Sequence, residues 1–362
     1  MMLTRRLFYT LLLFTYFLAL TGIVWFSKKT RTIHERMATT RQESPTLRIF
    51  MYGTKYGQMG NVFFELAALL GIADTLGRVP VIDSNDLLAW DALYDYTGNR
   101  FPRLLEQFNA LHVPKDDLKM VNITEFCCVY GKTHELKNET ARHLMIRGIH
   151  FQSFKYFDHM RSEIRSIFQP STPLFQFSEK LLPNEYKNDF IICPHIRRGD
   201  FETSSYHNPS SAEFTLKATE FLIKKYLKTH PKITVMVFGN DHIWSTETFS
   251  EISEYNIFIS KGMSVAVDIA FASSYCDVVL ITAPSSTFGW WLGYLAKENA
   301  VVYYRDISEA GDKMKAHMIE EDYYPPSWKK LKSDGTIFIR LVKNMKKLST
   351  RLRTIPDSVA KE

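Results

Sequence analysis

The sequence predicts an α/β fold with parallel sheets. From residue 48 onward, short apolar runs alternate with segments of helical periodicity. Three of the apolar runs end in polar turns that lead into apolar helices, which is the strand–loop–helix unit of such folds. Hydrophobic residues make up 45% and charged residues 23% of the 362 positions. These globular proportions exclude a disordered, collagen-like or coiled-coil chain.

The N-terminal region is expected to anchor the chain in a lipid bilayer. Residues 7–26 contain no charged side chain, and basic residues flank them on both sides. A helix of about 20 residues spans the hydrocarbon core of about 30 Å. A cleaved signal peptide would have a shorter apolar region and a small-residue cleavage site. We therefore expect a cytoplasmic tail at 1–6, a transmembrane signal anchor at 7–26 and a polar stem at 27–47.

Two observations bear on orientation and disagree. Two basic residues precede the span and three follow it closely, which by itself argues against a cytoplasmic N-terminus. The Asn-X-Thr sequons at Asn122 and Asn138 require the opposite orientation, because glycans are added on the lumenal side. We give more weight to the sequons and predict a single-pass type II protein, N-glycosylated at both positions.

Charge and cysteine content narrow the classes of partner. The net charge of +6 fits an anionic small ligand or a membrane surface. No arginine-rich tract accompanies it, so no nucleic-acid partner is expected. Cys127, Cys128, Cys193 and Cys276 show no CxxC spacing, which argues against structural zinc. One disulfide remains open if the compartment is oxidising.

The first chemistry-bearing segment runs from an apolar strand at 47–53 through a glycine-bearing loop to a helix at 62–76. Gly77 stands where a helix C-cap is expected. Such a unit presents backbone N–H groups to a ligand. The loop lacks the P-loop lysine and the GxGxxG spacing, so a dinucleotide site is not predicted. A purely structural turn remains an open alternative.

The second segment ends a predicted buried strand with His195, Arg197, Arg198 and Asp200. In an open α/β sheet, ligands bind at the carboxyl ends of strands. Arg197 and Arg198 point to opposite faces of an extended chain, so one can meet an anion while the other pairs with a carboxylate. The planar guanidinium donates two parallel hydrogen bonds to phosphate. A purely structural ion-pair cluster is the alternative.

The third segment places Ser285, Ser286 and Thr287 between a strand at 275–282 and an apolar helix. One hydroxyl suffices to cap the helix, whereas three in succession suit a phosphate or sugar ligand. The two tryptophans that follow are expected in the core. Asp241, after another predicted strand, either caps the next helix or reaches the ligand.

Together these segments resemble the galactoside α-1,2-fucosyltransferase family and, more distantly, the GDP-fucose-dependent transferases that share an His-x-Arg-Arg-x-Asp motif. The similarity covers roughly residues 48–310. The motifs that carry it, in the family's order, are Gly57-Gln-Met-Gly60-Asn61, His195-Ile-Arg197-Arg198-Gly199-Asp200, and Cys276-Asp277 through Ser286-Thr287-Phe288-Gly289-Trp290-Trp291.

The resemblance implies a GT-B architecture with two Rossmann-like halves facing across a cleft. It implies an acceptor-side half at 48–185 and a GDP-fucose-binding half at 186–326. The lysine-rich remainder at 327–362 is expected to form a solvated amphipathic helix and a tail. With the anchor, stem and sequons, this describes a type II Golgi membrane enzyme with a lumenal catalytic domain.

The resemblance also implies catalysis without a metal or other cofactor. The sequence has no D-x-D motif, and Asp200-Phe-Glu202 is its nearest approach. Arginine must then meet the charge that develops on GDP. The residues expected in catalysis are Arg197, His195 and Asp200. Those expected to bind the donor are Arg197, Arg198, His195, Asn61, Ser286, Thr287 and Phe288.

The implied reaction converts GDP-β-L-fucose into an α-L-fucoside on O2 of a galactose-terminated glycan, with inversion. Such a displacement needs a general base for the acceptor hydroxyl. The spacing does not decide among the candidates, which are Glu65, Asp200, Glu202, Asp241 and His195.

Two other readings stay open. Val62 stands where the family usually has glutamine after Gly60-Asn61, which leaves open a fucosyltransferase of another linkage. A catalytically silent Golgi protein that binds glycan or nucleotide is the second. A sulfotransferase is disfavoured, because the first loop has no lysine-bearing phosphosulfate loop.

Overall fold

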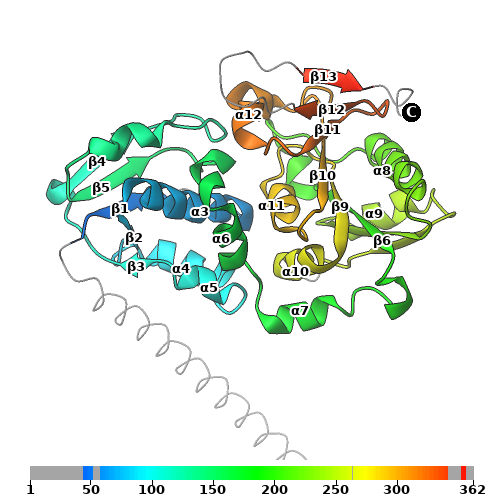
Figure 1. Ribbon diagram of the computed structural model, residues 1–362, viewed down its shortest axis with the longest axis horizontal. Coiled ribbons are helices and arrows are strands. Elements are labelled where there is room, and N and C mark those ends of the chain that lie inside the picture. Colours follow the sequence, from blue (N-terminus) through cyan, green and yellow to red (C-terminus); the bar gives the residue numbers. More distant parts are fainter. Residues whose placement is uncertain (1–43, 52–57, 263, 341–351, 356–362) are drawn as a thin grey trace, which may run out of the picture.

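The computed structural model describes residues 44–51, 58–262, 264–340 and 352–355. It contains two largely parallel sheets with helices packed around them (Figure 1). The predicted α/β class is therefore confirmed. The predicted cytoplasmic tail, the anchor at 7–26 and most of the stem lie outside the described residues.

The first sheet is parallel throughout. Its strands, in spatial order, are β3 (Asn109–Ala110), β2 (Val79–Ile82), β1 (Thr46–Ile49), β5 (His143–Arg147) and β4 (Leu118–Asn122). Because β1 begins at Thr46, the last two residues of the predicted stem belong to this sheet.

The second sheet has a parallel body and an antiparallel edge. In spatial order its strands are β13 (Leu352–Ile355), β12 (Ile337–Arg340), β11 (Lys329–Leu331), β10 (Val301–Arg305), β9 (Cys276–Ile281), β6 (Phe190–Ile196), β7 (Ile233–Gly239) and β8 (Asn256–Ile259).

Each sheet has a point where the chain order reverses. In the first sheet β1 lies between β2 and β5, and in the second β6 lies between β7 and β9. At such a point the loops after neighbouring strands diverge and leave a crevice at their carboxyl ends. The loops after β1, β5, β6 and β9 are therefore the ones placed to hold a ligand.

Helix α3 (Met59–Leu76) is the central helix of the first half. It ends as predicted at Gly77, whose φ of 63° places it in the left-handed region that glycine favours. Among the described residues it is the one helix long and apolar enough to cross a membrane, yet 78% of it is buried inside the protein. Its apolarity therefore reflects packing on both sides.

The other α-helices surround the two sheets (Figure 1). They are α4 (Leu87–Tyr96), α5 (Pro102–Leu105), α6 (Arg161–Ile167), α7 (Thr172–Ser178), α8 (Ala212–Leu227), α9 (His242–Phe249), α10 (Val265–Tyr275), α11 (Thr287–Leu295) and α12 (Glu320–Tyr323). Helix α7 packs against α10, although it precedes the predicted boundary between the halves at 185/186.

An aromatic layer joins α3 to α11. The ring of Phe64 lies 4.5 Å from that of Trp290, and the ring of Phe63 lies 5.5 Å from that of Trp291. Phe168 stacks on Trp291 with the ring centroids 5.0 Å apart. Both tryptophans are fully buried, so the prediction that they belong to the core is confirmed.

All four cysteines are paired. Cys193 on β6 and Cys276 on β9 form a disulfide between adjacent strands, with Cα atoms 5.9 Å apart. Cys127 and Cys128 are joined to each other as sequence neighbours. The structure thus identifies the pairing that the sequence left open.

The C-terminal segment differs from its prediction. Residues expected to begin a solvated amphipathic helix form strands β11 and β12, with a turn at Gly335, where φ is 84°. Leu331 and Ile337 are buried in the core beside the second sheet, and this burial favours strands at the edge of the sheet over a solvated helix. Residues 341–351 and 356–362 of the predicted helix and tail lie outside the described residues.

Gly71 provides a test of how tightly α3 is packed. A Cβ at this position would lie 2.2 Å from the carbonyl oxygen of Tyr156, and backbone cannot move aside as a side chain can. Alanine favours a helix over glycine by about 1 kcal/mol, but overpacking costs about 1–3 kcal/mol. We expect Gly71→Ala to lower the free energy of unfolding in denaturant titrations. Unchanged or raised stability would contradict this packing.

Candidate active site

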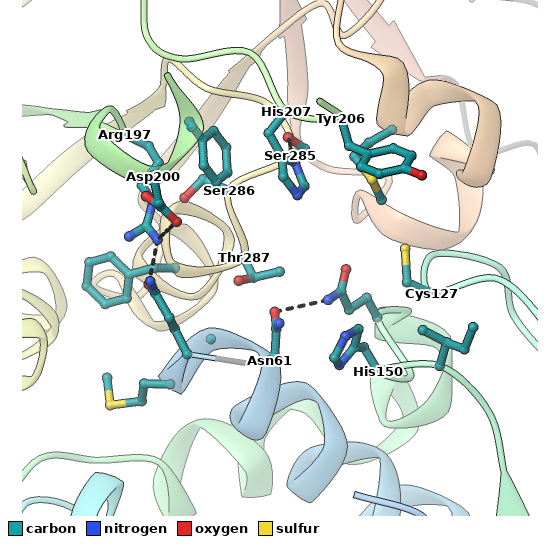
Figure 2. A pocket seen from close by; sticks show the side chains of 18 of the residues that line it. Asn61, Cys127, His150, Arg197, Asp200, Tyr206, His207, Ser285, Ser286 and Thr287 are labelled. Carbon is teal, nitrogen blue, oxygen red and sulfur yellow. Dashed lines mark hydrogen bonds and ion pairs between the residues drawn. The ribbon is translucent and has the colours of Figure 1, made fainter. Parts of the chain in front are cut away.

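A cavity of about 790 Å³ opens at the carboxyl ends of the strands, between the two sheets (Figure 2). Its walls include the segments 58–61, 149–152, 197–207 and 285–288. These segments follow β1, β5, β6 and β9, the strands that flank the two reversals of chain order. The cavity thus lies where parallel sheets bind ligands.

Arg197 extends into this cavity from the end of β6. Its backbone is fixed by Ser210, whose hydroxyl accepts from the Arg197 N–H at 2.9 Å and whose own N–H donates to the Arg197 carbonyl at 2.9 Å. The guanidinium Nη2 donates to Asp200 at 2.8 Å and to Gln58 at the start of α3. Its buried Nε–H finds no acceptor among the described residues.

Arg198 turns the other way, as the alternation of an extended chain predicts. Its guanidinium pairs with Glu202 and with Asp241, and it lies 4.5 Å from the ring of Trp244. These groups are outside the cavity wall. The structure therefore places the Arg198 side chain in a separate ion-pair cluster and not on the cavity, and its predicted role in donor binding stays a prediction.

The structure shows which of two roles Asp241 has, since the sequence left open whether it caps the next helix or reaches the ligand. Its carboxylate accepts from the Trp244 N–H at 3.0 Å and so caps α9. The neighbouring Asn240 fixes the Arg198 backbone, accepting from its N–H at 2.8 Å and donating to its carbonyl at 3.1 Å. Gly199 then reverses the chain with φ of 58°. This cluster therefore holds the turn that presents Arg197.

The amino terminus of α11 forms another part of the wall. Ser286 caps the helix by accepting from the Gly289 N–H at 3.2 Å, as predicted for one of the three hydroxyls. Thr287 and Phe288 line the cavity at the first turn. Unpaired N–H groups at a helix start favour an anion there. The helix start and Arg197 thus lie on the same cavity.

Asn61 stands on the first turn of α3, beside the start of α11. Its Oδ1 accepts from Gln152 Nε2 at 3.1 Å (Figure 2). Gly60 makes this placement geometrically feasible, because a Cβ there would lie 2.6 Å from the Thr287 hydroxyl. The predicted residues Asn61, Arg197, Asp200, Ser286, Thr287 and Phe288 all line the one cavity.

His195 lies below the cavity. Its side chain is buried, and a Cβ on Gly289 would sit 2.7 Å from its Nδ1, so the ring packs against α11. Burial, with a smaller contribution from Arg197, lowers the pKa of His195 to about 3, and the ring is neutral at physiological pH. His195 is still within β6 and α11 covers it, so it does not line the cavity, and its predicted role in catalysis and donor binding stays a prediction.

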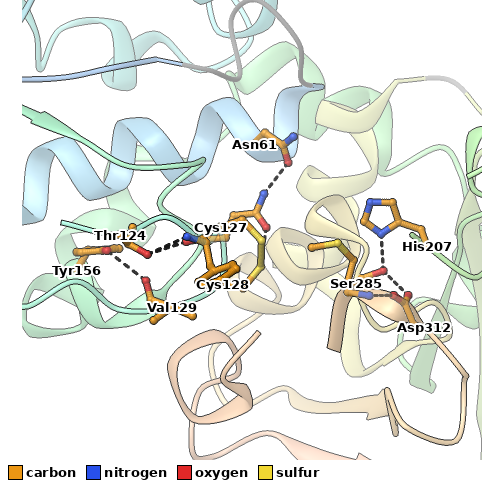
Figure 3. The surroundings of a disulfide bond; sticks show 12 residues. Asn61, Thr124, Cys127, Cys128, Val129, Tyr156, His207, Ser285 and Asp312 are labelled. Carbon is orange, nitrogen blue, oxygen red and sulfur yellow. Dashed lines mark hydrogen bonds between the residues drawn. A yellow bond between two sulfur atoms is a disulfide. The ribbon is translucent and has the colours of Figure 1, made fainter. Parts of the chain in front are cut away.

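A hydrogen-bonded network that the sequence did not reveal joins three loops above α11. The Ser285 hydroxyl lies 2.8 Å from His207 Nδ1 and donates to Asp312 (Figure 3). Burial lowers the pKa of His207, although Asp312 and Asp200 oppose this effect. His207 and Ser285 both line the cavity. The network fixes this wall next to Arg197.

The wall opposite Arg197 includes Cys127 (Figure 2). Its disulfide with the neighbouring Cys128 is drawn in Figure 3. Cys127 lines the cavity, and its carbonyl accepts from the Gln152 N–H at 2.8 Å. The Cys128 carbonyl accepts from the Ile319 N–H at 3.2 Å. This linked pair therefore connects the loop after β4 to the one after β5 and to the segment before α12.

His150 also lines the cavity, paired with the fully buried Glu65. No sequence motif pointed to it. The sequence shows only that His150 follows an apolar strand. This position indicates a site residue only once β5 is known to lie beside β1.

The candidate general bases differ in whether they lie on the cavity. Glu65 is buried behind the wall, and Glu202 and Asp241 pair with Arg198. Asp200 lies on the cavity but is paired with Arg197. Within the described ranges, no three histidine, cysteine or carboxylate side chains come together as metal ligands.

The two sequons lie on the surface of the first half. Asn122 is exposed at the end of β4, and Asn138 is exposed in the turn before β5. Both side chains are accessible to a modifying enzyme.

Comparison with known proteins identifies the family. Residues 23–332 match glycosyl transferase family 11. Two galactoside 2-alpha-L-fucosyltransferases of Caenorhabditis elegans are 38% and 35% identical. The alignments cover 80% and 76% of this chain and 78% and 77% of theirs. The crystal structure of the fucosyltransferase NodZ from Bradyrhizobium aligns at 14% identity over 74% of this chain and 96% of its own, with a TM-score of 0.42.

The family resemblance that the three motifs predicted is thus confirmed over most of the chain. The protein is a glycosyltransferase, and it belongs to glycosyl transferase family 11, with galactoside 2-alpha-L-fucosyltransferases among its relatives.

Proposed function

We propose that the protein transfers L-fucose from GDP-β-L-fucose to O2 of a galactose at the end of a glycan, with inversion and without a metal ion. The names of its relatives support fucosyl transfer to a galactoside. The observation that carries the mechanism is that the guanidinium of Arg197 and the first turn of α11 line the same cavity.

The donor diphosphate would lie between Arg197 and the start of α11. Both groups offer N–H donors to the same region of the cavity, and charge-assisted bonds to phosphate are the stronger kind. As the bond from the sugar to the β-phosphate breaks, negative charge grows on the leaving GDP. Donors already fixed in place stabilise that charge without reorganising.

Asp200 and Gln58 position the guanidinium rather than react. Both accept hydrogen bonds from its Nη2 atom, one from the loop after β6 and the other from the start of α3. The ring of Phe201 lies 5.3 Å from the guanidinium carbon. These contacts leave the remaining N–H groups to face the phosphate.

The acceptor galactoside would enter against the opposite wall, formed by the loops after β4 and β5. Asn61 and Gln152 meet there, and Cys127 and Ile149 add apolar surface of the kind that packs against a sugar ring. In this proposal the two sheets correspond to the two halves of a GT-B enzyme, with the cavity as the cleft between them.

We also propose that residues 7–26 hold this domain in the Golgi lumen as a type II membrane protein. The support is the uncharged length of that segment and the exposure of Asn122 and Asn138 on the folded domain.

Replacing Arg197 tests the proposed donor site. Removing one preorganised donor to a developing anion costs about 2.7–4 kcal/mol, so we expect Arg197→Ala to lower kcat by about 100-fold to 1,000-fold. GDP-fucose turnover with a β-galactoside acceptor measures this. Arg103→Ala is the matched control, because Arg103 is exposed on α5 and bonds to Ser166 outside the cavity. A variant at position 197 that keeps most of the wild-type rate would remove this role from Arg197.

Chelation tests the proposed independence from metal ions. We expect full turnover in EDTA, because arginine and helix N–H groups would take the place of a cation at the diphosphate. Initial rates with and without chelator, followed by added manganese, provide the measurement. Loss of activity in EDTA that manganese restores would contradict the mechanism.

Glycan analysis tests the proposed orientation. Expressed in cells with a secretory pathway, the full chain should lose mass on N-glycosidase treatment, because both sequons would face the lumen. Asn122→Gln and Asn138→Gln should each remove one glycan, and the double variant should be insensitive. A wild-type chain unaffected by the enzyme would contradict a lumenal catalytic domain.

A further inference from the structure

His150 and Glu65 form a carboxylate–imidazole pair in the wall of the cavity. His150 Nδ1 lies 3.3 Å from Glu65 Oε1, and the imidazole is among the residues that line the cavity (Figure 2). The Glu65 side chain is fully buried, whereas that of His150 is 21% exposed. The pair therefore has its carboxylate behind the wall and its ring at the surface.

The backbone around His150 is held in an unusual conformation. His150 and Phe151 have φ of 54° and 49°, so two successive residues with side chains occupy the left-handed region. Such a conformation is unfavourable for residues with side chains and persists only where the surroundings impose it. The segment is tied down on its far side by Gln152, whose N–H donates to the Cys127 carbonyl and whose amide donates to Asn61. The chain is thus bent to place His150 on the cavity.

The buried carboxylate determines which ring nitrogen carries the proton. We assign the tautomer with hydrogen on Nδ1, because an ionised Glu65 carboxylate would only accept hydrogen bonds. The lone pair then resides on Nε2. A carboxylate behind an imidazole is the arrangement by which a third group orients a histidine base.

We propose that His150 is the general base for the acceptor hydroxyl and that Glu65 positions it. This inference rests on the proposed function. As the acceptor oxygen forms its bond to the anomeric carbon of fucose, the hydroxyl proton passes to His150 Nε2. The bond from the anomeric carbon to the β-phosphate oxygen breaks, and its electron pair leaves with GDP. His150 then returns the proton to solvent.

Besides His150, the charged and titratable side chains that line the cavity are Tyr96, Arg100, Glu125, Arg197, Asp200, Tyr206, His207 and His317. Asp200, His207 and His317 fit this step less well than His150. Asp200 is paired with the guanidinium on the proposed phosphate side, and His207 is bound in the network with Ser285. His317 contacts the rings of Phe126 and Tyr206. In contrast, His150 stands on the proposed acceptor wall with a buried carboxylate behind it.

The test compares His150→Ala, His150→Asn and Glu65→Gln in the full-length protein. We expect both His150 variants to lower kcat by at least about 100-fold, the low end for general base catalysis. Wild-type kcat should fall at acidic pH as the ring takes up a proton, and this limb should vanish in the variants. Imidazole in solution should restore part of the His150→Ala rate. Glu65→Gln should lower kcat less than the His150 variants do, because the ring then loses its positioning partner but keeps the lone pair that accepts the proton.

Helix α3 offers a matched control in a second histidine–carboxylate pair. His159 Nε2 lies 3.1 Å from Asp74 Oδ2 on the protein surface, away from the cavity, so His159→Ala should leave kcat and the pH profile unchanged. Retention of most activity in both His150 variants, or an unchanged acidic limb, would overturn the proposal.

Binding of GDP, measured by calorimetry, separates this proposal from the proposed function. The His150 variants should bind GDP as the wild type does, which also shows that they are folded. A wild-type protein that turns over no GDP-fucose would contradict the proposed function. An active wild type whose variants lose GDP binding together with activity would instead show that His150 is structural.

Discussion

The close approach of two helix starts determines the geometry of this enzyme. The α3 backbone at Gly60 lies so near to Thr287 and the Phe288 N–H that no side chain fits between them. The indole of Trp291 donates to the Gly60 carbonyl at 3.0 Å and fixes the same contact from below. The aromatic layer between α3 and α11 then buries the rest of the interface. Helix α3 packs on the first sheet and α11 on the second. Their contact therefore sets the distance between the loops that line the cavity.

The polar groups of the cavity depend on that spacing. From the first turn of α3, Gln58 reaches Arg197 on one side and Asn61 reaches Gln152 on the other. One short segment therefore contacts both the proposed phosphate-binding wall and the proposed acceptor wall. In the proposed mechanism, a cavity built in this way would hold the donor and the acceptor in line, and such positioning is a large part of what a group-transfer enzyme contributes.

The sequence predicted those parts of the structure that depend on local pattern. The apolar periodicity of α3 with its terminal glycine, the burial of Trp290 and Trp291, and the opposite directions of Arg197 and Arg198 all follow from backbone geometry. Contacts between segments that are far apart in the chain could not be predicted from local pattern. Whether His195 is covered depends on α11, which lies far along the chain, and His150 gains meaning only because β5 adjoins β1.

The C-terminal strands are a second example of structure that the sequence alone did not predict. A lysine-rich segment predicts a solvated helix when its charges are considered alone, yet Leu331 and Ile337 extend an existing sheet edge.

The central claim is that a guanidinium and a helix start, brought together by the Gly60 contact, hold the leaving diphosphate. A crystal structure with bound GDP tests it most directly. The account predicts β-phosphate oxygens within about 3.2 Å of Arg197 nitrogens and beside the first turn of α11. A diphosphate bound elsewhere in the protein, away from both groups, would contradict it.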